Sequence, residues 1–180
     1  MGVLSLGICV GCEEMYGQKL HVRKGDTMKN SDAGKLPFAR IDQVGVVVKD
    51  LEKAVDYYSS LGIGPFEGLN LNRKARTVYG KAVDDVKNVS RVAQMGAVQL
   101  ELIQPVSGES IQREFLETRG EGVNHLGFFV DDVDKEVAKL VAKGFKVISS
   151  VTYVGGGSVA YLDTDRLGGV QFELIQWPPR

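Results

Sequence analysis

The pattern of apolar and polar residues along the chain predicts short strands separated by amphipathic helices. Apolar and β-branched residues open two regions of similar layout, at 41–48 and 123–130, and each run predicts a strand. Three further strand-like runs follow each opening, at 76–82, 90–95 and 97–104 in the first region and at 146–153, 158–163 and 170–176 in the second. Because side chains in a strand alternate between two faces, each run also predicts which residues lie together.

Each opening strand is followed by the signals of a helix. Asp50 and Asp132 stand at N-cap positions, where a carboxylate accepts a hydrogen bond from a free backbone N–H group. The residues after each aspartate carry apolar side chains three and four positions apart, which is typical of a helix with one buried face. Gly62 and Gly144 then mark the helix ends. A further helix is predicted at 109–118, between the two regions.

The two regions are copies of one unit. The sequence VQLELIQ at 98–104 returns at 170–176 as VQFELIQ, and a looser match relates 43–51 to 125–133. The matches keep their order, with offsets of 82 residues (125 − 43) and 72 residues (173 − 101), so the first copy has the longer middle. We therefore predict an α+β fold: two tandem βαβββ modules forming a curved, mostly antiparallel sheet with helices on its outer face.

This repeat divides the chain into four predicted parts: an arm at 1–36, a first module at 37–106, a linking helix at 107–121 and a second module at 122–180. The arm is rich in charge, Gly, Ser and Asn and is expected to be flexible, with Met28 as a possible alternative start. Both cysteines, Cys9 and Cys12, lie in it. A single C-x-x-C pair without a second ligand pair favours two incidental thiols over a zinc or redox site.

Composition and charge argue against several classes of partner. The chain is 43% hydrophobic and 25% charged, which is ordinary for a soluble globular protein. Its formal net charge of -1 gives no electrostatic reason to expect nucleic acid or an anionic membrane. No apolar run approaches the roughly 18–20 residues that span a bilayer. We expect a cytoplasmic protein with a small-molecule partner.

Strand alternation places four polar residues on the face away from the helices. Leucines at 100, 102 and 174 take the helix-covered face, so Glu101 and Glu173 point the other way. Gln43 and His125, at matching positions of the opening strands, share that face. An imidazole, two carboxylates and an amide oxygen suit Zn²⁺, Ni²⁺, Co²⁺, Mn²⁺ or Mg²⁺. Their duplication favours a metal site over polar residues on a solvated sheet face, provided the two modules curl together.

Residues 38–177 resemble the vicinal oxygen chelate superfamily, in which the opening strand of each module supplies a His or Gln and the last strand a Glu. The resemblance implies that Gln43, Glu101, His125 and Glu173 bind one divalent ion, Co, Ni, Zn or Mn. The stretches 41–51 and 120–132, and Glu101 to Pro105, look similar to the methylmalonyl-CoA epimerases of this superfamily. The combination of Gln, Glu, His and Glu is similar to one form of glyoxalase I.

The chain departs from the epimerases at two points. Their first ligand is usually His, where this chain has Gln43. Their second base, a Glu before the third strand, is replaced by Lys87 and Asn88, unless the alignment shifts onto Asp84 or Asp85. The dioxygenase branch requires two histidines and a carboxylate on iron, and the only histidine outside the arm is at 125. The metal-free antibiotic-binding branch tends to lose the ligands that are present here.

The resemblance implies proton abstraction next to a carbonyl, through an enolate stabilised by the metal. Glu173 is the first candidate for the base and Glu101 the second, for the opposite face; simple ligation with a base elsewhere is the alternative. The expected function is that of a metal-dependent isomerase or epimerase of the methylmalonyl-CoA epimerase type, acting on a carbonyl or thioester substrate as a homodimer. The alternatives are a glyoxalase I-like lactoylglutathione lyase and a non-catalytic binder of small molecules.

Overall fold

The computed structural model describes residues 38–69 and 71–179. The predicted arm, with Cys9, Cys12 and Met28, lies outside the described residues. Within them, no helix is long and apolar enough to cross a membrane.

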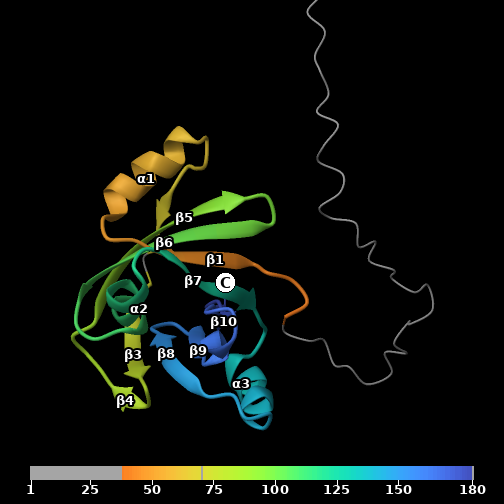
Figure 1. Ribbon diagram of the computed structural model, residues 1–180. Helices are drawn as coiled ribbons and strands as arrows, with labels where there is room; N and C mark the ends of the chain where they lie inside the picture. The colour runs from red at the N-terminus through yellow and green to blue at the C-terminus, as the bar shows by residue number, and fades with distance from the viewer. Residues whose placement is uncertain (1–37, 70, 180) are drawn as a thin grey trace, which may run out of the picture. The chain divides into compact units, whose positions relative to one another are not determined.

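The described residues contain ten strands in one sheet, ordered β2-β5-β6-β1-β7-β10-β9-β8-β3-β4 (Figure 1). The strands are β1 (Gln43–Val47), β2 (Glu67–Gly68), β3 (Arg73–Val78), β4 (Lys81–Ala82), β5 (Lys87–Met95), β6 (Val98–Ser107), β7 (Gly122–Phe129), β8 (Val147–Tyr153), β9 (Ser158–Leu162) and β10 (Gln171–Gln176). The helices are α1 (Leu51–Ser60), α2 (Ile111–Arg119) and α3 (Val133–Val141), with a short 3₁₀ turn at Thr164–Arg166.

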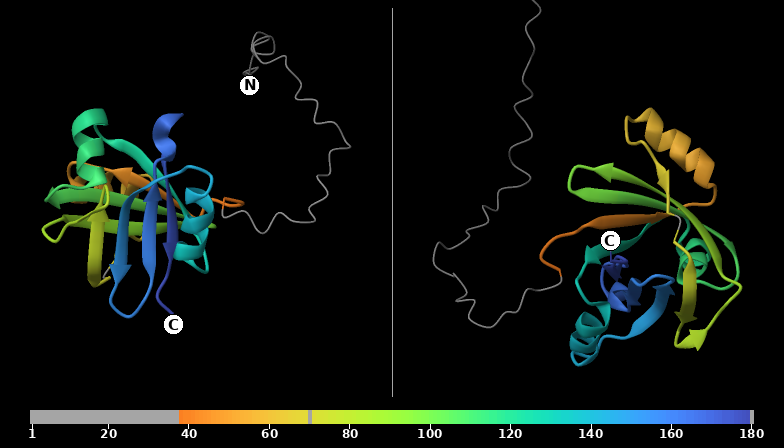
Figure 2. Two further views of the ribbon diagram at one scale, coloured as in Figure 1. Left: turned by 90° about the horizontal axis from the view of Figure 1, so that it is seen from below. Right: turned by 180° about the vertical axis from the view of Figure 1, so that it is seen from behind.

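The centre of the sheet is a symmetric group of four strands. The opening strands β1 and β7 run antiparallel to each other, and each has the last strand of its own half, β6 or β10, parallel beside it. The remaining strand pairs are antiparallel. The sheet curls, and α1 and α3 lie outside the curve (Figures 1 and 2). The predicted α+β fold is confirmed.

The two faces of the sheet follow the predicted alternation. Leu100 and Leu102 are buried beneath α1, in a cluster with Leu51. Leu174 is buried beneath α3, in a cluster with Val133 and other apolar residues. Because these residues face outward to the helices, their neighbours in the strands face the concave side.

The helix starts are built alike in both halves. Asp50 and Asp132 each accept a hydrogen bond from the backbone N–H three residues on, at 3.2 and 2.9 Å, which confirms the predicted N-caps. Gln104 and Gln176, the last residues of the repeated heptapeptide, each accept the N–H of the first helical residue at 3.0 Å. The last residue of the repeat therefore links the last strand of each half to the helix that covers it, through one hydrogen bond.

One predicted strand, at 76–82, is wrong in its extent. Residues 76–82 span the end of β3, a turn at Tyr79 and Gly80, both with positive φ, and the short antiparallel strand β4. The hairpin pairs with β8 of the second half, whereas the two-residue β2 occupies the corresponding edge of the first half, beside β5. The longer middle of the first copy thus crosses to the far edge of the sheet. Alternation could not indicate this, since edge pairing joins residues distant in sequence.

The linking helix, predicted at 109–118, begins after the N-cap Ser110 and differs from the other two helices in its surroundings. Its first residue, Ile111, is buried against Val151, Val159 and Ile175. These three residues belong to the concave side, where they line a cavity. The start of α2 therefore covers part of the inner face of the sheet.

Candidate metal centre and cavity

The four residues selected by alternation and repeat meet at the centre of the sheet. His125 Nε2 lies 3.0 Å from Glu173 Oε2, 3.3 Å from Gln43 Oε1 and 3.6 Å from Glu101 Oε2. All four are buried, with exposed fractions of 2% for Gln43, 8% for Glu101, 0% for His125 and 4% for Glu173. Ligand atoms of Glu101, His125 and Glu173 lie within 4.8 Å of one another, so these three residues could hold a metal ion.

Two glycines make this convergence possible. In the central antiparallel pair, Gly45 lies opposite His125 and Gly127 lies opposite Gln43. A Cβ atom on Gly45 would lie 1.9 Å from Cε1 of the His125 ring, and one on Gly127 would lie 2.9 Å from Cβ of Gln43. Each glycine therefore leaves the space that a site residue of the other half fills.

The glutamates complete a symmetric arrangement around these glycines. Glu101 of β6 lies beside Gly45, and Glu173 of β10 lies beside Gly127. Across each glycine, the glutamate of one half thus faces the histidine or glutamine of the other half. Both halves of a single chain contribute to the site.

Asn124 orients the histidine, and sequence reasoning did not select it. His125 Nδ1 lies 3.3 Å from Oδ1 of Asn124, which is fully buried and donates to Gln171 Oε1 at 3.5 Å. If Nδ1 carries the proton and donates to Asn124, the lone pair of Nε2 faces the two carboxylates. The signal in the sequence is a polar residue directly before His125 inside an apolar strand.

The electrostatics of the cluster fit a bound cation. Burial raises the pKa of Glu101 to about 7, with Glu173 adding to the rise and His125 opposing it. Burial disfavours the charged form of His125, but the carboxylates of Glu173 and Glu101 outweigh it and raise the pKa of the imidazole. Glu173 Oε2 is buried, and when His125 Nε2, 3.0 Å away, carries no proton, it has no hydrogen-bond donor among residues 38–69 and 71–179. Two buried carboxylates with an unsatisfied oxygen are costly unless a positive ion compensates them, so the donor set fits a divalent metal.

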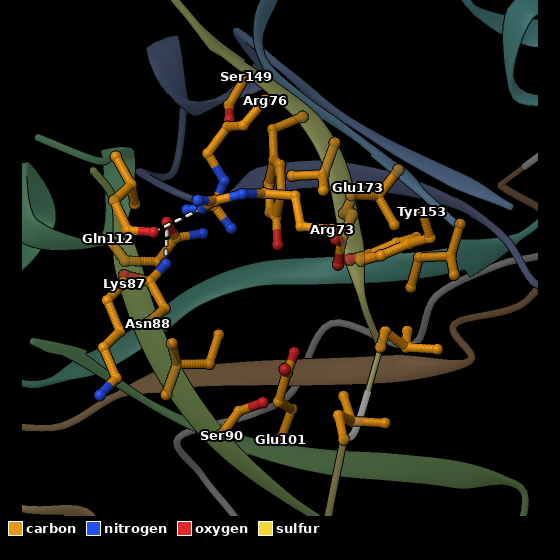
Figure 3. A pocket seen from close by; sticks show the side chains of 18 of the residues that line it. Arg73, Arg76, Lys87, Asn88, Ser90, Glu101, Gln112, Ser149, Tyr153 and Glu173 are labelled. Carbon is orange, nitrogen blue, oxygen red and sulfur yellow. Dashed lines mark hydrogen bonds between the residues drawn. The ribbon is translucent and has the colours of Figure 1, made fainter. Parts of the chain in front are cut away.

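A cavity of about 570 Å³ opens from this cluster, with Gln43, Glu101 and Glu173 in its lining. The wall formed by β5 contributes Lys87, Asn88 and Ser90, and none of its residues is a carboxylate. Asp84 and Asp85, in the loop before β5, also line the cavity. Figure 3 shows the residues of the wall together with Glu101 and Glu173. A substrate in this cavity would contact the candidate metal residues directly.

The duplicated βαβββ unit, the paired opening strands and the buried polar cluster between the halves define a scaffold of the vicinal oxygen chelate type. The chain belongs to the Glyoxalase/Bleomycin resistance protein/Dioxygenase superfamily, whose family model matches residues 42–161.

Relatives within this superfamily include both named and uncharacterized proteins. The mitochondrial methylmalonyl-CoA epimerase of Mus musculus is 28% identical over 169 residues, which cover 89% of this chain and 84% of that protein. The uncharacterized protein YqjC of Bacillus subtilis is 25% identical over 140 residues, which cover 76% of this chain and 91% of that protein. A solved structure of a methylmalonyl-CoA epimerase variant from Streptomyces coelicolor, in complex with 2-nitronate-propionyl-CoA, is 25% identical with a TM-score of 0.59, covering 78% of this chain and 98% of that chain.

Proposed function

We propose that the protein is a divalent-metal-dependent epimerase. It would remove and return a proton at the carbon next to a thioester carbonyl, a reaction in keeping with the name of its relatives, the methylmalonyl-CoA epimerases. The observation that carries the proposal is the buried meeting of Glu101, His125 and Glu173 at the head of a cavity. Similarity to epimerases in sequence and in structure supports the same class of reaction.

The residues that would hold the ion are Gln43, Glu101, His125 and Glu173, by the distances around His125 Nε2. The bound ion would supply positive charge beside a substrate carbonyl, which makes the neighbouring C–H group more acidic. With four protein ligands, an ion that prefers six would still accept substrate oxygens.

Glu101 and Glu173 are the proposed acid and base. They lie on opposite sides of the β1–β7 pair, beside Gly45 and Gly127 respectively. A substrate carbon held over this pair would have one carboxylate toward each of its faces. One carboxylate would remove the proton and the other would return a proton to the opposite face, which inverts the centre. Glu173 is the first candidate for the base, since its buried Oε2 has no hydrogen-bond donor in the described residues when His125 Nε2 is unprotonated.

The second base of the epimerases was expected just before the third strand, which is β5 here. Lys87 and Asn88 open that strand and line the cavity, and Asp84 and Asp85 line it from the preceding loop. Tyr161 lies opposite Glu173 in the neighbouring strand, and burial together with Glu173 raises the pKa of its hydroxyl well above the usual value. Tyr161 therefore keeps its proton at neutral pH and can donate it in a hydrogen bond to the Glu173 carboxylate.

The test combines metal content with proton exchange. Elemental analysis of the full chain should give about one divalent metal per chain, and less in Gln43→Ala, His125→Ala and Glu173→Ala. The exposed Gln94→Ala on β5 is the control and should retain the metal. The metal-loaded protein should exchange the α-proton of methylmalonyl-CoA with D₂O, followed by NMR, and Glu173→Gln should lower that rate at least 100-fold.

Two other outcomes would replace the proposal. Turnover of the thiohemiacetal of methylglyoxal and glutathione, without exchange on the thioester, would identify a glyoxalase I-like lyase. Absence of stoichiometric metal, with no activity after addition of Co²⁺, Ni²⁺, Mn²⁺ or Zn²⁺, would identify a non-catalytic binder.

A further inference from the structure

The β3–β4 hairpin carries two arginines into the cavity. Arg73 and Arg76 lie three positions apart, a spacing that would send them to opposite faces of a regular strand. The register against β8 shifts between Arg73 and Ala75, and this bulge restores them to one face. Arg73 pairs with Tyr153 and Arg76 with Val151, and all four residues line the cavity. Figure 3 shows both arginine side chains reaching into it.

Arg73 is held in place by neutral groups. Its Nη1 donates to the carbonyl of Val86 at 2.5 Å, and its Nη2 donates to the carbonyl of Asp84 at 2.7 Å. Within residues 38–69 and 71–179 it forms no ion pair. The guanidinium is therefore fixed in position while its charge is left without a carboxylate.

Arg76 is half-buried, and its Nε is buried without a hydrogen-bond partner in the described part of the chain. Burial lowers the pKa of this guanidinium, and the nearby charge of Arg73 lowers it further. Leaving a buried donor unsatisfied costs free energy, and the cost is greater for a charged group. A ligand that brings acceptor oxygens would remove that cost.

The acidic residues of the cavity do not neutralise this pair. Asp84 and Asp85 line the cavity and are exposed residues of the loop before β5. Neither forms an ion pair with an arginine in the described structure. Glu101 and Glu173 belong to the metal cluster, where one divalent ion would balance their two charges. With the metal bound, the hairpin therefore presents two positive charges that lack a counter-charge.

We infer that Arg73 and Arg76 form a subsite for an anionic oxygen group of the ligand, a carboxylate or a phosphate. A planar guanidinium donates two parallel hydrogen bonds to either group, which neither a neutral amide nor an alcohol can match. The inference deepens the proposed function, because the subsite and the metal cluster share one cavity: the substrate would present a carbonyl to the metal and an oxyanion to the hairpin. The hairpin has no counterpart in the second half, so this selectivity belongs to the first copy alone.

Binding measurements on the full chain test the subsite. The dissociation constants of malonate, inorganic phosphate and the neutral malonamide are measured by NMR titration, for wild type and for Arg76→Gln. We expect at least a tenfold loss of affinity for one or both anions in Arg76→Gln, and no saturable binding of malonamide. A loss confined to malonate identifies a carboxylate of the acyl group, and a loss confined to phosphate identifies a carrier phosphate.

Lys74→Gln is the matched control, since it removes the same charge from an exposed residue inside the bulge. It should bind both anions as wild type does. Arg76→Lys keeps the charge without the planar fork and should recover only part of the affinity. Equal affinities in wild type and Arg76→Gln for both anions, or equal losses in Lys74→Gln, would overturn the inference.

The subsite and the proposed function can fail separately. Arg76→Gln should retain the metal content and melting temperature of wild type, so a loss of anion affinity is not a loss of the metal site. The titrations are repeated on chelated protein, where Arg76-dependent binding should persist. If the protein proves to hold no metal, the epimerase proposal falls, and the chelated titration still decides the subsite.

Discussion

The ring of His125 lies over Gly45, in the space where any other residue at position 45 would place its side chain. A Cβ atom there would come within 1.9 to 2.4 Å of three ring atoms. The glycine therefore acts as a positioning residue for the histidine, although it supplies no ligand atom itself. The same relationship between Gly127 and Gln43 is looser, with a nearest approach of 2.9 Å.

Gly45→Ala should displace the His125 ring and lower metal affinity at least tenfold, because the ring cannot remain at 1.9 Å from the new methyl group. Gly127→Ala should have the smaller effect, since its closest contacts, Cβ of Gln43 and Cδ1 of Ile175, lie 2.9 Å away, whereas the His125 ring comes to 1.9 Å at position 45. Competition with a chromogenic chelator measures both affinities. Wild-type affinity in Gly45→Ala would show that the histidine is not held by this contact.

Asn124→Ala should weaken metal binding about 10- to 100-fold, as removal of an outer partner of a ligating histidine typically does. The physical reason is that Nδ1 loses its acceptor 3.3 Å away, so the tautomer and orientation of His125 are no longer fixed. Asn124→Asp keeps an acceptor oxygen and serves as the comparison. ¹⁵N NMR of the imidazole reports the tautomer directly. An unchanged tautomer in Asn124→Ala would refute the role assigned to the amide.

Gln104→Ala and Gln176→Ala should each destabilise the fold by about 1 kcal/mol, because each leaves the first N–H of a helix without its acceptor. Urea unfolding measures the change in the free energy of unfolding. The exposed Gln94→Ala should cost much less. The two losses of stability should add in the double variant, since the two helices begin in different halves. If only one substitution lowered the stability, the hydrogen bond of the repeated glutamine would stabilise one half and not the other.

Asp163→Asn tests the pH dependence of the fold. Partial burial works against the charged form of Asp163, but the Lys146 N–H, 2.7 Å away, and Arg166 outweigh it and lower the pKa below 3.8. A folded pKa below the unfolded one adds stability above the unfolded value, and that stability is lost as the pH falls through the folded value. Asp163→Asn should therefore lose at most about 1 kcal/mol at pH 7, and the difference from wild type should narrow below pH 3.8.

Unfolding of the Asp163 variant is compared with that of Asp131→Asn, which makes the same substitution at an exposed aspartate. A gap between Asp163→Asn and wild type that is the same at pH 7 and pH 3 would show that the charge of Asp163 does not stabilise the fold.

The repeat, the helix caps and the four candidate metal residues could all be predicted from the amino-acid sequence. Strand alternation has a period of two, so the apolar leucines beside Glu101 and Glu173 were enough to fix the face of each glutamate. The duplication then placed Gln43 and His125 at matching positions of the opening strands. Alternation and capping are local properties, carried by residues within a few positions of one another, and the repeat is found by comparing two such stretches.

The pairing of strands between the two halves could not be predicted from the sequence. The pairing of β3 with β8 and the bulge that turns Arg73 and Arg76 to one face depend on contacts between residues distant in the chain. The burial of Ile111 on the concave side and the contact of Gly45 with His125 have the same origin. Sequence periodicity reports which face a residue takes within its own strand. Long-range packing determines which strands lie next to each other. In this protein, that strand pairing shapes the cavity around the candidate metal site.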